Sequence, residues 1–181
     1  LSALAEAATV LDREDYLNIA IKNADFLLAE LRPDGRLLRT WKDGIAKLDA
    51  YLEDHANLAD GLIEIYQATG DTKYLAAGKE LAEAMIVEFW DEDGGGFFFT
   101  SHGHEQLPVR TKDHFDNATP SGNSAAADVL LRLEKFTGDE RFGRFARATL
   151  RLAAVQAARY PSGFGRTLSA MEFALAPVRE Y

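Results

Sequence analysis

The residues with the greatest potential for chemistry lie in one segment, from Asp113 to Ser124. Its twelve residues include two carboxylates, a histidine, two asparagines and three hydroxyls, and an apolar helical pattern follows directly. Carboxylates that flank a pocket suit hydrolysis of a glycosidic bond, in which one acts as the general acid and the other as base or nucleophile. The segment is therefore either an elaborate helix cap or one wall of a site.

A second polar segment, from Asp49 to His55, also leads into a helical pattern. A histidine at a helix start would suit proton abstraction in an epimerisation, and Trp41 could serve as a stacking platform for a sugar ring. The candidate catalytic residues are Asp54, His55, Asp113 and Asp116. The candidate ligand-binding residues are Trp41, Asp49, Tyr51, Arg110, Lys112, Asn117, Ser121 and Asn123.

Helix capping is the alternative for several of these residues. Asp54, Thr119 and Ser121 stand where the unpaired N–H groups of a helix start need acceptors, and Pro120 suits the first helical position. Arg110 and Lys112 could recognise a carboxylate or a phosphate, or could pair with acids of the chain itself. His102 and His104 resemble metal ligands, but no carboxylate has a fixed place beside them, and we expect neither a metal nor a cofactor.

Two identical tripeptides indicate an internal repeat. Thr69-Gly70-Asp71 and Thr137-Gly138-Asp139 lie 68 residues apart (139 − 71 = 68). Each glycine suits the left-handed position that closes one helix, and each aspartate suits the cap that opens the next. Apolar residues at helical spacing flank both tripeptides, and Asp12 to Leu17 marks an earlier copy.

The repeat predicts an all-α domain with short β-hairpin decorations, spanning residues 1–181. The expected helical hairpins are 1–31, 52–90 and 121–159, and a further inner helix starts at 167–175. Alternating inner and outer helices of this kind build α/α toroids, and three hairpins and a fraction would form about half of an (α/α)6 barrel. We expect one hairpin between Phe97–Thr100 and Leu107–Arg110, and all inner-helix starts at one mouth.

Charge and composition argue against nucleic-acid and membrane partners. A formal net charge of −9 argues against a nucleic-acid partner, because such binding requires neutralisation of phosphates by basic residues. The longest apolar runs are too short for a transmembrane helix, and we expect no membrane partner. The sequence contains no cysteine and no recognisable leader, so the expected location is the cytoplasm.

Three motifs carry a family resemblance. The segments Asp116 to Ala126, Leu52 to Ala56 and Phe89 to Phe98 resemble the D-[GN]-A-x-P-S-G-N, L-E-D-[YH]-A and F-W-D-x-x-x-G-G motifs of the YyaL / spermatogenesis-associated-protein-20 family. The resemblance implies a thioredoxin-like domain followed by a toroid similar to the N-acylglucosamine 2-epimerases and six-hairpin glycosidases. It further implies that this chain is the middle part of that toroid.

Two functions follow as expectations. The first is a toroid segment that binds or processes a sugar or a sugar-like ligand at the mouth, as in a hydrolase or an epimerase, although this segment alone would be inactive. The alternative is a non-catalytic scaffold that binds a ligand or partner for the thioredoxin-like domain. Whether the parent protein is an enzyme stays open. The apolar end helices, which contain Leu1, Leu4, Leu168 and Phe173, also predict self-association.

Overall fold

The computed structural model describes residues 1–104 and 109–176, and within them the fold is all-α with one small β-hairpin. The α-helices are α1 (Ser2–Leu11), α2 (Glu14–Glu30), α3 (Leu52–Thr69), α4 (Thr72–Phe89), α5 (Gly122–Thr137), α6 (Glu140–Arg159) and α7 (Gly165–Leu175). The hairpin strands are β1 (Leu38–Lys42) and β2 (Ile45–Asp49), and a short 3-10 helix, η1 (Pro161–Gly163), precedes α7.

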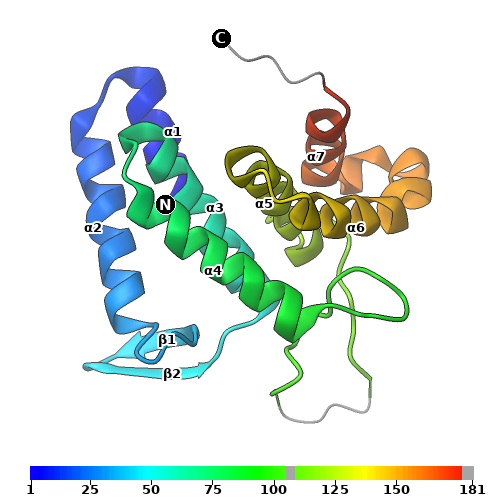
Figure 1. Ribbon diagram of the computed structural model, residues 1–181, viewed down its shortest axis with the longest axis horizontal. Helices are drawn as coiled ribbons and strands as arrows, with labels where there is room; N and C mark the ends of the chain where they lie inside the picture. The colour runs from blue at the N-terminus through cyan, green and yellow to red at the C-terminus, as the bar shows by residue number, and fades with distance from the viewer. Residues whose placement is uncertain (105–108, 177–181) are drawn as a thin grey trace.

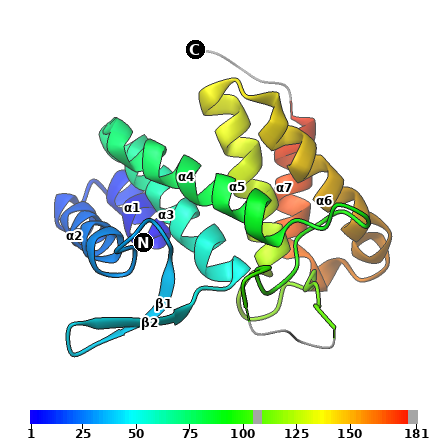
Figure 2. The same ribbon diagram turned by 60° about the horizontal axis from the view of Figure 1, so that its bottom comes forward.

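The helices form two rows (Figures 1 and 2). In the inner row α1 packs against α3, α3 against α5, and α5 against α7. Each outer helix, α2, α4 or α6, packs between the inner helix before it and the inner helix after it. The inner helices α3 and α5 are consequently buried along most of their length, which explains their long apolar runs.

The repeated tripeptides have the same role in both copies. Gly70 and Gly138 both adopt a φ of +70°, and each closes its helix in the left-handed conformation that favours glycine. The carboxylates of Asp71 and Asp139 then accept backbone N–H groups of the next helix at 3.0 Å. Asp12 closes α1 in the same left-handed conformation, with a φ of 52°.

Large aromatic side chains fill the space between the two rows. Tyr74, Phe89 and Phe142 of the outer helices are at most 1% exposed, and Phe97 and Phe164 from the connecting segments are fully buried. Fully burying a side chain of this size contributes about 1.5–3 kcal/mol to stability. The connecting segments are thus held in place by their own aromatic residues.

The β-hairpin lies at Leu38–Asp49, not where the sequence led us to expect it. In the described part of the expected hairpin, Phe97–His104 and Val109–Arg110, no strand forms, and Leu107 and Pro108 lie outside the described residues. At the observed hairpin, Asp43 and Gly44 form the turn with φ values of 52° and 79°. Positive φ at both central residues defines the tight turn that an Asp-Gly pair favours.

In residues 1–104 and 109–176, every helix is too short or too polar to cross a lipid bilayer.

Candidate functional site

The first turns of α3, α5 and α7 meet at one end of the inner row (Figure 2). A Cβ added to Gly122 would lie 2.9 Å from Cδ2 of Leu52, so glycine allows the starts of α5 and α3 to touch. Thr167, in the first turn of α7, bonds to a side chain just before α5. We name this surface, formed by residues 49–55, 113–124 and 165–167, the inner-helix mouth. Helix dipoles favour negative charge here.

Asp116 uses both of its carboxylate oxygens to cap two helices. Its Oδ1 accepts hydrogen bonds from Ser121 N at 2.9 Å and Ser124 Oγ at 2.5 Å, at the start of α5. Its Oδ2 accepts hydrogen bonds from Thr167 N at 3.1 Å and Thr167 Oγ1 at 3.4 Å, at the start of α7. Both oxygens of Asp116 are therefore engaged in joining the starts of α5 and α7.

Asn123 connects the start of α5 to the segment that follows α4. Its Oδ1 accepts the Phe97 N–H at 2.8 Å, and its Nδ2 donates to the carbonyl oxygens of Phe97 and Asp113, both at 2.9 Å. The side chain is 2% exposed. Beside this contact, Phe97 forms an isolated antiparallel bridge with Trp90, in which Phe98 N donates to Phe89 O at 2.8 Å and Asp91 N donates to Gly96 O at 2.9 Å. The segment therefore pairs with the end of α4 and is held by Asn123, in place of the expected hairpin.

Asp54 caps the start of α3 and binds an arginine of the hairpin. Its Oδ2 accepts hydrogen bonds from Tyr51 N and from Arg39 Nη1, both at 2.9 Å. Arg39 also binds Glu53 Oε1 at 3.1 Å, and all three charged side chains remain about one third exposed. The carboxylate of Asp54 therefore has a structural partner but still faces solvent.

His55 is buried, with 3% of its surface exposed. Its Nδ1 lies 3.0 Å from the carbonyl oxygen of Tyr51, which can only accept, so Nδ1 carries the proton. Burial lowers the pKa of His55, and this favours the neutral ring. The ring also packs edge-on against Phe89 at 5.1 Å between centroids. These contacts fit a core histidine.

Three further candidates have packing or pairing roles. The Tyr51 ring stacks on Phe99 and His104 at 4.6 and 5.1 Å between centroids. The indole of Trp41 contacts α2, with its edge on Phe26 and its Nε1 donating to Glu30 at 3.2 Å. Finally, Asp49 pairs with Arg36 at 2.7 Å.

Arg110 and Lys112 both bind groups of the chain itself. Arg110 donates to the carbonyl oxygen of Thr100 and lies 2.9 Å from Nδ1 of His102. Lys112 binds a carboxylate oxygen of Asp91 at 2.5 Å and also the carbonyl oxygen of Gly95. Both side chains thus hold the segment between α4 and α5 in its folded conformation.

The remaining candidates lie between Asp113 and Ser121. Asp113 and Asn117 are exposed, and the carboxylate of Asp113 accepts the backbone N–H of Phe115 at 3.1 Å. Ser121 is 3% exposed and caps α5 by accepting the N–H of Ser124 at 3.1 Å. Among the candidates in this loop, Asp113 and Asn117 are therefore the ones that a partner or ligand could reach directly.

Sequence reasoning missed a group of ion pairs between the inner helices. Nη2 of Arg166 donates to Asp60 at 2.9 Å and to Asp128 at 2.7 Å, and Arg132 binds Asp60 at 2.8 Å. We name these four residues the inner ion-pair junction. Burial raises the pKa of Asp128, although Arg166 opposes this effect. The signal in the sequence was the presence of charges within otherwise apolar helices, with Asp128 and Arg132 four residues apart.

The carboxylates of the inner-helix mouth mainly bind backbone N–H groups of the chain itself. Asp54, Asp113 and Asp116 each accept at least one backbone N–H group. In each case a carboxylate oxygen is engaged with the backbone of the chain itself. The exposed groups can still form hydrogen bonds to a ligand or a partner.

Comparison with known proteins supports the family resemblance, although no family model matches the chain. Spermatogenesis-associated protein 20 of Homo sapiens is 34% identical over 149 residues, which cover 76% of this chain and 19% of that protein. The protein of the same name from Mus musculus gives the same values. An uncharacterized protein of Caenorhabditis elegans is 29% identical over 150 residues, which cover 78% of this chain and 20% of that protein.

The chain spans about a fifth of the length of the curated relatives it matches. The matched region nevertheless covers about three quarters of the chain itself, and the motifs in the sequence predicted the same family. The resemblance of this chain to the spermatogenesis-associated-protein-20 family is therefore confirmed.

Proposed function

We propose that this chain is a non-catalytic scaffold, a segment of an α/α toroid that presents the inner-helix mouth to a partner or a ligand. The observation that carries the proposal is the capping role of Asp116, whose oxygens are shared between the starts of α5 and α7. Asp54 supports it, because its carboxylate accepts the N–H of Tyr51. A carboxylate used in this way stabilises the start of a helix.

The inner ion-pair junction supports the same proposal. Arg166 of α7 bonds to Asp60 of α3 and Asp128 of α5, so one guanidinium connects three inner helices. Buried charge pairs add little net stability compared with apolar residues, but they can favour one alignment over its alternatives. In a scaffold, such a junction would fix the relative positions of the helix starts that form the mouth.

The surface offered to a partner is the loop from Asp113 to Pro120. Asp113 and Asn117 are exposed, and Phe115 is 44% exposed although its ring packs against Phe164. An apolar ring beside polar groups is a common composition for a protein interface. The family resemblance makes a thioredoxin-like domain the proposed partner.

The second candidate function is binding of a sugar or a sugar-like ligand at the same mouth. It is favoured by Arg39, Glu53 and Asp54, whose side chains are 36%, 34% and 27% exposed. Such groups can donate and accept hydrogen bonds to hydroxyls. Hydrolysis or epimerisation by the parent protein would then need catalytic groups beyond those that cap the helices.

Calorimetric titration and thermal melts can separate the two candidates. The scaffold proposal predicts saturable binding of a thioredoxin-like domain taken from a longer relative, weakened about tenfold or more in Phe115→Ala. It also predicts an unchanged melting temperature in a panel of monosaccharides and N-acetylated amino sugars at 10 to 50 mM. The matched control is Val109→Ala, an exposed apolar residue outside the loop. A saturable sugar-induced rise in melting temperature, lost in Arg39→Ala, would instead support the second candidate.

A further inference from the structure

The outer helix α6 differs in charge from the two other outer helices. It contains five arginines and one glutamate, a sum of +4 (5 − 1 = +4). By contrast, α2 sums to −3 (1 − 4 = −3) and α4 to −1 (2 − 3 = −1), and the whole chain has a formal net charge of −9. The three helices have equivalent places in the outer row (Figure 1). Their shared packing role therefore does not explain the positive charge of α6.

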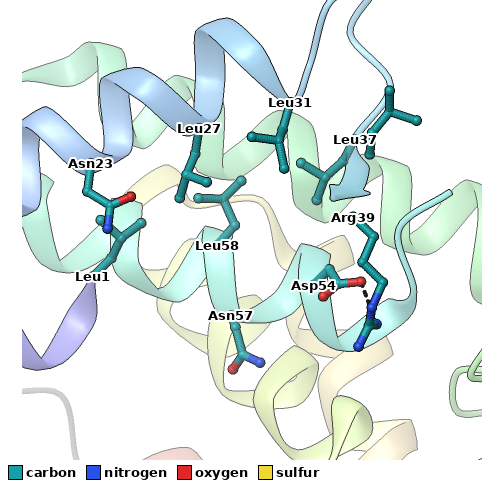
Figure 3. A pocket seen from close by; sticks show the side chains of 10 residues that line it. Leu1, Asn23, Leu27, Leu31, Leu37, Arg39, Asp54, Asn57 and Leu58 are labelled. Carbon is teal, nitrogen blue, oxygen red and sulfur yellow. Dashed lines mark hydrogen bonds and ion pairs between the residues drawn. The ribbon is translucent and has the colours of Figure 1, made fainter. Parts of the chain in front are cut away.

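Some arginines of the chain are held by its own carboxylates. Within α6, Arg141 binds a glutamate of α4 and Arg147 binds a glutamate of α5, both at 2.8 Å. On the hairpin, Arg39 binds Asp54 in the same way, at one end of the groove between α2 and α3 (Figure 3). These side chains already have partners and are not available to another protein without losing them.

The other three arginines of α6 lie along its outer face. Arg144, Arg151 and Arg159 are exposed, and none of them forms an ion pair with a carboxylate in the described parts of the chain. They are seven and eight residues apart, so about two helical turns separate each from the next. Val155, which is 66% exposed, lies on the same face, and Ala153 with the other buried residues of α6 lies on the opposite face. We name Arg144, Arg151, Val155 and Arg159 the α6 stripe.

The composition of the α6 stripe indicates a protein partner. Proteins that bind duplex nucleic acid commonly neutralise about six to ten phosphates, and recognition of anionic membranes takes about four to eight basic residues. Three arginines fall short of both, and the net charge of −9 repels such polyanions at long range. Arginine is enriched at protein–protein interfaces, whose centres are apolar. Val155 and its neighbour Leu152, which is 44% exposed, supply such an apolar centre.

We propose that the α6 stripe is a docking surface for an acidic amphipathic helix of a partner protein. Carboxylates seven or eight residues apart on a helix recur about every two turns, which is the spacing of the three arginines. Each guanidinium can bind a carboxylate through two parallel hydrogen bonds, and apolar residues between the acids would cover Val155. None of these residues belongs to the inner-helix mouth, so the proposal does not depend on the function proposed for the mouth.

A fluorescent, end-capped helical peptide of alanine and glutamine tests the proposal. It carries glutamates at the spacing of the three arginines and leucines one turn after the first and second glutamates. Fluorescence anisotropy should show saturable binding to the chain. Arg151→Glu should weaken this binding about tenfold or more, because it places like charges opposite each other. The matched control is Lys22→Glu, the same change of charge at an exposed site on α2, and it should leave the affinity within about twofold.

A second peptide, with lysine in place of the central glutamate, separates a specific pair from general attraction. It should bind the Arg151→Glu chain more tightly than the parent chain, because the reversed pair again has opposite charges. Arg144→Glu repeats the test at a second position, and melting curves show that each variant is folded.

The proposal would be overturned by an absence of saturable binding up to about 1 mM peptide, or by equal losses in Arg151→Glu and Lys22→Glu. Tighter binding to phosphatidylserine vesicles or to duplex DNA than to the first peptide would contradict it too. Dissociation of a dimer of the parent chain by Arg151→Glu would assign the α6 stripe to a second copy and also count against it.

Discussion

The carboxylate of Asp116 accepts the backbone N–H of Thr167 at 3.1 Å, across 51 residues of sequence. Its other oxygen accepts the N–H of Ser121 at 2.9 Å. One side chain thereby caps the starts of two neighbouring inner helices and fixes their separation. In this structure, Asp116 and Asn123 of the family motif therefore hold neighbouring segments at the helix starts together.

Asn123→Ala should lower the free energy of unfolding by about 2–3 kcal/mol, because it leaves the buried N–H and C=O of Phe97 without their partner. Asn123→Asp should cost at least as much, because a carboxylate cannot donate to the two carbonyl oxygens. Urea denaturation measures both changes. A loss below about 0.5 kcal/mol in both variants would show that the Phe97 segment does not depend on Asn123.

His55 should make the protein less stable in acid. Its folded-state pKa lies below the unfolded value of about 6.5, so its contribution is present above that pH. The contribution is lost as the pH falls through the folded pKa, because the unfolded state binds the proton more readily. His55→Gln should flatten the dependence of unfolding free energy on pH between about 6.5 and 5. A slope identical to that of the parent chain would contradict this prediction.

Asp128 should have the opposite dependence on pH. Its folded-state pKa is raised by burial, so its contribution is present below the unfolded pKa of about 3.9 and is lost as the pH rises through the folded pKa. Asp128→Asn cannot ionise, so relative to the parent chain it should be more stable at pH 7 than at pH 4. Denaturation at the two pH values tests the sign. A relative stability that falls between pH 4 and pH 7 would show that Arg166 outweighs burial.

Self-association through the end helices remains a prediction of the sequence, and the structure shows which side chains are available for it. On α7, Leu168, Phe173 and Leu175 are 38%, 40% and 85% exposed. We expect sedimentation at micromolar concentration to detect dimers or larger species. Phe173→Asp should shift them toward the monomer, whereas Val87→Asp, an exposed site on α4, should not. A strictly monomeric parent chain would contradict the prediction.

Much of the helical architecture could be predicted because it depends on local chemistry. Gly70 and Gly138 end their helices through backbone conformation, and Asp71 and Asp139 start the next through bonds to residues two positions later. The Asp43-Gly44 turn is equally local, because an Asp-Gly dipeptide favours this tight hairpin turn.

The site could be predicted only in part, because its decisive contacts are not local. Ser121 and Asp54 cap helices in their own sequence neighbourhood, and capping was one of the two alternatives that the sequence left open. Asp116 instead reaches Thr167, and Arg166 reaches Asp60, across intervals that no local pattern encodes. Arg39 was missed for the same reason, since only the fold of the hairpin brings it to Asp54.

We expect Asp116, at the inner-helix mouth, to support the fold rather than a reaction. The most direct test compares Asp116→Asn with Asp113→Asn, which remove the same charge from a capping position and from an exposed one. Urea denaturation should show a loss of about 2–4 kcal/mol for Asp116→Asn, because both helix caps are disrupted, and less than about 0.5 kcal/mol for Asp113→Asn. Losses below about 0.5 kcal/mol for both variants would contradict the account and return Asp116 to the candidates for catalysis.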